Sequence, residues 1–228
     1  MLLKFTKKSL ASLLGGTALC LGALGMSGFV STAYAQEEGR QFSAKAGEQV
    51  NEALQLINSG QHSAALSALS NALNISPLNA YERSTINQMQ GASYYELNQY
   101  GPAISSFQNA INAGGLLPNE ADSLRVNIAQ LMIANEQYAE GAGALENYLN
   151  RGGQQKPQYI EMLTQAWVQS ENYARALPWA EKWFNAASPK ERKHFDLMNF
   201  LGTSQYPRHD GTRQASIFDL MVWHGVWQ

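Results

Sequence analysis

The residues of this 228-residue chain that could bind a metal are few, and their spacing matches no established site. Imidazole and carboxylate groups near the C-terminus could in principle act as ligands: His194, Asp196, His209, Asp210 and His224. Zinc sites place such groups at short, recurrent spacings, which these residues do not show. We therefore predict no metal site and no cofactor.

Nucleophiles and phosphate-binding loops are also lacking. The only cysteine, Cys20, lies in an apolar N-terminal run, and no glycine-rich loop follows a strand pattern. His62 stands where related segments carry tyrosine, so we interpret it as a packing residue. The sequence predicts a protein that is not an enzyme, with no catalytic residue and no small-molecule substrate.

Hydrogen bonding by side-chain amides is the chemistry that remains. Amides donate and accept, which suits the backbone of an extended peptide, and tyrosine adds amphipathic area. A plain hydrated face is the alternative interpretation. The predicted partner-binding residues, on the exposed side of successive helices, are Gln88, Tyr95, Asn127, Gln130, Glu161, Gln165 and Gln169.

A fourfold pattern predicts the helices that carry these amides. Each copy has a small residue followed by apolar residues at i+1, i+4, i+7 and i+8, which share one helical stripe. The copies begin at Ala65, Ala103, Gly141 and Ala176, so they are 38, 38 and 35 residues apart. This fixed spacing favours a stacked helical array over a generic amphipathic bundle, which needs no such register.

A second helix precedes each of these copies. Twelve residues before each small residue stands another small one: Ala53, Gly91, Ala129 and Thr164. Small residues are expected where paired helices approach most closely. The positions assigned a structural role in the repeat are Ala53, Ala65, Ala72, Gly91, Tyr94, Ala103, Phe107, Ala110, Ala129, Gly141 and Ala176.

The stretch GASYYELNQYGPAISSFQNAI, residues 91–111, resembles the tetratricopeptide repeat (TPR). The third and fourth copies depart from that pattern at Gly141, Tyr148 and Trp183. The resemblance covers about residues 42–201 and implies an all-α fold, a right-handed α-solenoid of about four helix-turn-helix units plus a first helix of a fifth. It also implies a protein partner. The carboxylate-gripping clamp of one TPR subtype is missing, because Val50, Gln88, Val126 and Glu161 occupy the relevant face.

A narrower resemblance involves residues 117–141 and 161–183. They look like exported TPR proteins associated with TonB-type energy-transduction systems of Gram-negative bacteria. This implies a periplasmic interaction scaffold that serves TonB-dependent outer-membrane transport. The alternative is a noncatalytic regulatory or assembly subunit of another envelope complex, such as a cell-wall enzyme or secretion machinery.

Capping signals set the expected helix boundaries. Asn79 with Glu82 forms a capping box, and Gly114-Gly115 and Gly152-Gly153 provide left-handed helix ends. The expected helices are 42–58, 62–75, 79–97, 100–112, 119–135, 138–150, 157–170, 173–186 and 190–201. Residues 202–228 break the pattern, so we expect an irregular tail. It is either disordered or an altered end outside the array, or it folds back as a partial cap.

The N-terminus has the features of a secretory signal peptide. Lys4, Lys7 and Lys8 precede an apolar run, and Ala33-Tyr34-Ala35 forms a cleavage site. An uncleaved membrane anchor is the alternative. Removal of residues 1–35 leaves 13 basic and 18 acidic residues, a net charge of about −5 that disfavours nucleic acid.

We predict that the mature protein is periplasmic, begins at Gln36 and meets the membrane only during export, because the A-x-A site ends at Ala35. Intact-mass measurement of the periplasmic fraction checks this prediction. A full-length mass in the membrane pellet would instead establish the anchor.

Overall fold

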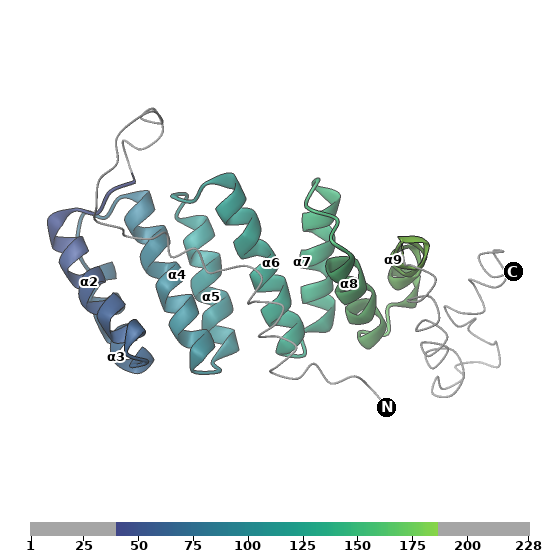
Figure 1. The fold of residues 1–228 in the computed structure, drawn as a ribbon, viewed down its shortest axis with the longest axis horizontal. Helices are drawn as coiled ribbons and strands as arrows, with labels where there is room; N and C mark the ends of the chain where they lie inside the picture. Colours follow the sequence, from purple (N-terminus) through teal and green to yellow (C-terminus); the bar gives the residue numbers. More distant parts are fainter. Residues whose placement is uncertain (1–39, 187–228) are drawn as a thin grey trace, which may run out of the picture. The chain divides into compact units, whose positions relative to one another are not determined.

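The computed structural model of the chain describes residues 40–186. Within this range the chain forms eight helices and no strand. They are arranged as an α-solenoid of helical hairpins, so the predicted fold class is confirmed (Figure 1). The chain divides into two compact units, with the boundary after Gln137, and each unit is described by itself.

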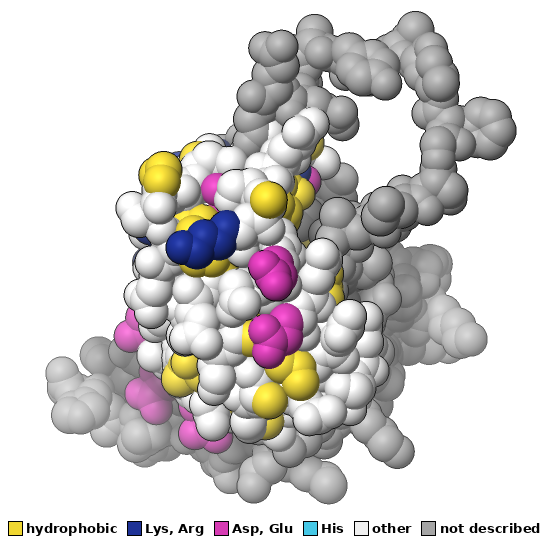
Figure 2. Space-filling model, turned by 90° about the vertical axis from the view of Figure 1, so that its left-hand side faces the viewer, with side chains coloured by type: hydrophobic (Ala, Val, Ile, Leu, Met, Phe, Trp, Pro, Cys, Tyr) yellow, Lys and Arg dark blue, Asp and Glu magenta, His cyan; other side chains and the backbone are white. Residues whose placement is uncertain are grey.

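Unit 1 contains five helices that pack in chain order, each against the next. They are α2 (Ala44–Asn58), α3 (His62–Leu73), α4 (Ala80–Glu96), α5 (Tyr100–Asn112) and α6 (Pro118–Ala134). All five begin and end within two residues of the expected positions. Lys45, Glu48 and Glu52 of α2 are exposed, and Figure 2 shows acidic and basic side chains beside hydrophobic ones on this side of unit 1.

Unit 2 contains three helices, α7 (Tyr138–Asn150), α8 (Pro157–Gln169) and α9 (Tyr173–Ala186). The α8 helix packs against both of the others and buries Leu163 and Trp167. The predicted signal peptide, the expected helix 190–201 and the tail 202–228 lie outside the described residues.

The turn inside each hairpin has the same hydrogen-bonded geometry in all four copies. A residue with positive φ ends the first helix: Gly60, Asn98, Glu136 and Glu171. The next amide bonds the carbonyl five residues back, as in Gln99 N to Tyr94 O at 2.9 Å and Asn172 N to Trp167 O at 2.9 Å. This is the Schellman arrangement. The repeat register inferred from side chains is therefore repeated in the backbone.

Small residues lie where the helices of a hairpin approach most closely. Ala53, Ala65, Ala103, Ala110 and Ala176 are fully buried. A Cβ added at Gly91 of α4 would lie 2.4 Å from Cε1 of Phe107 on α5, far inside van der Waals contact. Phe107 is itself buried in a core that joins α5 to α6. The close approach of α4 to α5 therefore requires glycine at position 91.

A buried carboxylate joins the starts of two helices in unit 1. Glu82 is 1% exposed and accepts hydrogen bonds from Asn79 N at 2.7 Å and from Ser43 N at 2.7 Å. The Asn79 side chain accepts in return from Glu82 N at 2.8 Å, which completes the expected capping box. Burial raises the pKa of Glu82, but the hydrogen bonds from Asn79 and Ser43 outweigh it, so the pKa lies below its ordinary value.

Gly91→Ala should destabilise the protein by about 1–3 kcal/mol, because the new methyl group overpacks the site occupied by the Phe107 ring. Gly101→Ala is the matched control, since a Cβ there meets nothing within 4 Å. Urea unfolding of both variants measures the difference. If both variants were as stable as the wild type, the α4–α5 packing described above would be wrong.

Stability should also depend on pH through Glu82. Because the folded-state pKa is lowered, its contribution is fully present above the unfolded-state value of about 4.3 and is lost as pH falls through the lowered value. The Glu82→Gln variant should be less stable than the wild type at pH 7. It should also lose less stability than the wild type when the pH is lowered. Melting temperatures at pH 7 and across the acidic range test this, with the exposed Glu52→Gln as control. Identical pH profiles for wild type and Glu82→Gln would contradict it.

Candidate peptide-binding surface

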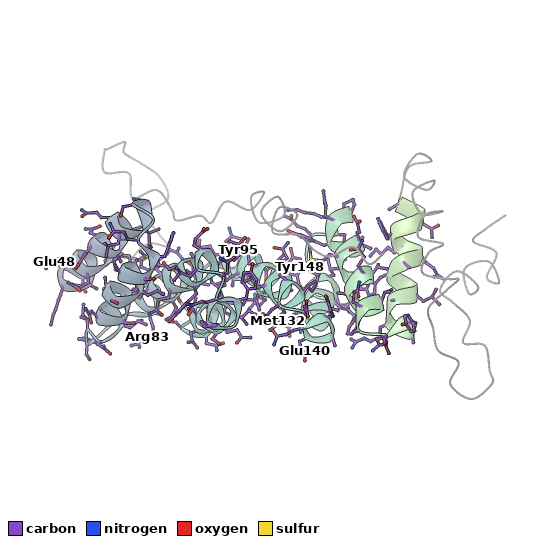
Figure 3. All side chains as sticks on the ribbon, turned by 90° about the horizontal axis from the view of Figure 1, so that it is seen from below. Glu48, Arg83, Tyr95, Met132, Glu140 and Tyr148 are labelled. Atoms are coloured by element: carbon purple, nitrogen blue, oxygen red, sulfur yellow. The ribbon has the colours of Figure 1, made fainter. Side chains whose placement is uncertain are left out.

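Two of the predicted binding residues share one side of α4. Gln88 and Tyr95 are seven residues apart, hence two helical turns, and both are half-buried. The Tyr95 ring stacks on Tyr100 with centroids 6.0 Å apart and an interplanar angle of 28°. Both rings and Met132 pack on the core that contains Phe107 and Leu131. Tyr95 and Met132 are labelled in Figure 3.

The Tyr95 ring is held by its stacking on Tyr100 and by the core beneath it, and the side chain is half-buried. Among residues 40–186, no hydrogen bond engages the hydroxyls of Tyr95 and Tyr100. Burial raises the pKa of Tyr95, with further contributions from Tyr100 and Glu96. The phenol is therefore neutral at physiological pH and can donate to a carbonyl. A stacked pair with anchored rings is a preorganised contact surface.

The expectation that Asn127 and Gln130 are exposed does not hold. They are 8% and 2% exposed, and the side-chain oxygen of each is buried without a hydrogen-bond partner among the described residues. The cause is the burial of α6 on several sides, since Val126, Ile128, Leu131 and Ile133 are buried with them. Their role in binding a partner stays a prediction. It now requires that the partner reach two side chains that are buried in this structure.

Sequence reasoning missed two further amides, which belong to α4. Asn87 and Gln90 are 6% and 8% exposed. Asn87 Nδ2 donates to Arg83 O at 2.7 Å, and Gln90 Nε2 lies 3.4 Å from Ser70 Oγ on α3. These bonds anchor the amides within the unit. Their one-turn spacing, Asn87 to Gln90, was the only sequence signal for a buried polar stripe.

The remaining predicted binding residues belong to unit 2. Glu161, Gln165 and Gln169 follow one another by four residues along α8 and are half-buried. Gln165 Nε2 donates to Glu161 Oε1 at 3.2 Å. The structure thus places two predicted residues on one side of α4, two buried on α6 and three along α8. A single surface composed of all seven residues stays a prediction.

Unit 2 also contains a cation–aromatic network that the sequence did not predict. The Arg175 guanidinium lies 4.0 Å above the Trp167 ring and forms an ion pair with Glu146. Trp179 Nε1 donates to the same carboxylate at 2.8 Å, and Lys182 lies over the Trp179 ring. The network joins α7, α8 and α9. Because its groups engage one another, we interpret it as structural.

Metal ligands do not gather in the described part of the chain. Residues 40–186 contain no group of three or more His, Cys, Asp or Glu side chains placed to hold an ion. The C-terminal candidates from His194 to His224 lie outside this range. Across the same range, no helix has both the length and the apolar character needed to span a membrane.

Comparison with known proteins identifies a fold but no family. No family model and no curated protein matches the chain. A solved structure titled "MamA RS-1 ArsTM double mutant" is similar, with a TM-score of 0.54 and 15% identity over 70% of this chain and 86% of that one. BtubC (BKLC) from P. vanneervenii has a TM-score of 0.48 and 17% identity over 77% and 73%. The first similarity supports a TPR-like α-solenoid, and at this identity it concerns the fold alone.

Proposed function

We propose that this protein is a noncatalytic scaffold that binds an extended segment of another protein. The stacked pair of Tyr95 and Tyr100 carries the proposal. Their rings are fixed on the core, while their hydroxyls have no hydrogen-bond partner among residues 40–186. Tyrosine supplies large contact area at low conformational cost, and such residues often dominate binding energy. Gln88, on the same side of α4, adds an amide for the partner's backbone.

We further propose that the scaffold acts in the periplasm as an accessory of a TonB-dependent outer-membrane transport system. The support is the predicted signal peptide and the resemblance of residues 117–141 and 161–183 to exported proteins of such systems. A regulatory or assembly subunit of another envelope complex is the alternative. The identity of the bound partner distinguishes the two.

The test is photo-crosslinking in living cells from position 88, with mass spectrometry of the trapped protein. We expect a component of the outer-membrane transport system. Adding Tyr95→Ala should reduce the crosslink about tenfold or more, because aromatic anchors often contribute about 2 kcal/mol. The α5 variant Gln108→Ala, at an exposed position, is the control and should leave it unchanged.

Each part of the proposal can fail separately. A folded Tyr95→Ala protein with undiminished crosslinking would exclude this surface as the binding site. A trapped cell-wall or secretion component would replace the transport assignment with the alternative, while the scaffold function would stand.

A further inference from the structure

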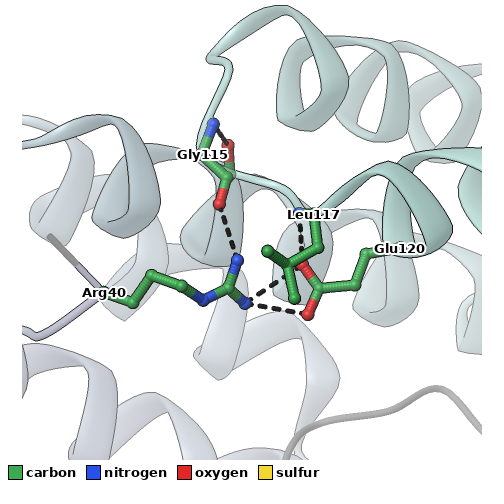
Figure 4. Close-up of polar contacts among 5 residues, drawn as sticks. Arg40, Gly115, Leu117 and Glu120 are labelled. Atoms are coloured by element: carbon green, nitrogen blue, oxygen red, sulfur yellow. Dashed lines mark hydrogen bonds and ion pairs between the residues drawn. The ribbon is translucent and has the colours of Figure 1, made fainter. Parts of the chain in front are cut away.

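The guanidinium of Arg40 occupies a site built from Tyr81, Gly115 and Glu120, which lie 41 to 80 positions further along the chain. Its Nη2 lies 2.8 Å and 3.0 Å from the two carboxylate oxygens of Glu120, and its Nη1 donates to Gly115 O at 3.1 Å (Figure 4). The group also lies 4.8 Å above the Tyr81 ring. The planar arginine fork suits this combination, because one nitrogen reaches the carboxylate and the other the carbonyl while the planar group lies over the ring.

The residues that follow Arg40 bind the same region. Gln41 O accepts from Asn79 Nδ2 at 3.0 Å, and the Phe42 ring lies 5.4 Å from the Tyr81 ring. Ser43 N donates to Glu82. We call residues 40–43 the strap and its binding residues the dock, namely Asn79, Tyr81, Glu82, Gly115 and Glu120. The dock thus contacts the backbone, the cation and the aromatic ring of the strap, as a peptide-binding site contacts its peptide.

Contacts that do not involve the strap hold the dock in shape. Glu120 Oε2 accepts from Leu117 N at 2.8 Å at the start of α6. Gly115 N donates to Ser84 Oγ at 3.0 Å, and Ser84 Oγ donates to Ala110 O at 2.8 Å. A Cβ at Gly115 would come within 2.3 Å of the Ala80 backbone, so the glycine lies directly against α4. The carbonyl and carboxylate that hold Arg40 are thus preorganised by α4, α5 and α6.

Only Ser43 of the strap caps a helix, and residues 40–42 lie outside α2, although Phe42 also packs on the core that contains Ala46 and Val50. The α2 helix begins at Ala44, and its own N-cap, Ser43, accepts from Ala46 N at 3.4 Å. Gln41 is exposed, and the Arg40 side chain keeps 24% of its surface in solvent. Residues 40–42 therefore can leave the dock without removing a residue from α2.

We propose that the dock is an exchangeable peptide-binding site, which the strap occupies in the free protein. It takes an extended Arg-x-aromatic segment of a partner protein in place of Arg40, Gln41 and Phe42. The arginine pairs with Glu120 and Gly115, and the aromatic side chain packs on Tyr81. This site is distinct from the surface around Tyr95, so the two proposals stand or fall separately.

The test measures binding of a fluorophore-labelled acetyl-Arg-Gln-Phe-Ser-amide peptide to the full chain by fluorescence anisotropy. Arg40→Ala/Phe42→Ala removes the competing strap and should bind the peptide about tenfold more tightly than wild type, because occupation by the strap reduces the fraction of open dock. Adding Glu120→Gln, which keeps an acceptor for Leu117 N, should abolish the gain. A peptide with Lys in place of Arg should bind the strap variant at least about threefold more weakly, because lysine lacks the second nitrogen that reaches Gly115 O while the first pairs with Glu120.

Circular dichroism establishes that each variant is folded before binding is compared. If Arg40→Ala/Phe42→Ala does not fold, Arg40→Gln retains the Phe42–Tyr81 contact and replaces it, with the same order of affinities expected. Equal affinity of the wild type and the strap variant would overturn the proposal. So would the absence of binding to a folded strap variant, or binding that is unaffected by Glu120→Gln.

Discussion

Close approach of paired helices is the constraint on which the rest of this structure depends. Hairpin helices can approach this closely only where side chains are absent or small, as at Gly91 beneath the Phe107 ring. The fully buried Ala53, Ala65 and Ala103 serve the same purpose. The larger apolar residues of each copy then fill the space between neighbouring helices. Each unit thus forms its core as a series of local contacts, in which each helix packs mainly against its neighbours in that unit.

Hydrogen bonds and an ion pair between helix starts connect distant parts of the sequence in unit 1. Two acidic residues at the third helical position, Glu82 and Glu120, each accept from a backbone amide at their own helix start. Each also binds the segment that precedes α2, Glu82 through Ser43 and Glu120 through Arg40. These contacts connect residues 39 to 80 positions apart. The carboxylates that cap helices are thereby also the groups that recognise an extended segment.

Function in such an array depends on which groups remain available once the helices have packed. In unit 1 most amides on α4 and α6 are buried, and Tyr95 and Tyr100 are half-buried with their hydroxyls unengaged among residues 40–186. In unit 2 the prominent cation and tryptophan side chains engage one another. Binding surfaces of this protein are therefore better sought among anchored aromatic rings and helix starts than among its most polar helical faces.

The sequence by itself determined the helices, their turns and the small residues at their contacts. The reason is physical: a 3.6-residue period, Gly60 and Asn98 at helix ends and an Asn79–Glu82 capping box are local features of the chain, although Glu136 and Glu171 take the same left-handed position without such a signal. Only the tertiary structure decided how many packed residues cover a given face of a helix. For this reason the burial of Asn127 and Gln130 on α6 could not be read from the sequence. The position of Arg40 against Glu120 likewise depends on stacking three hairpin starts side by side, and residues 80 positions apart leave no periodic signal.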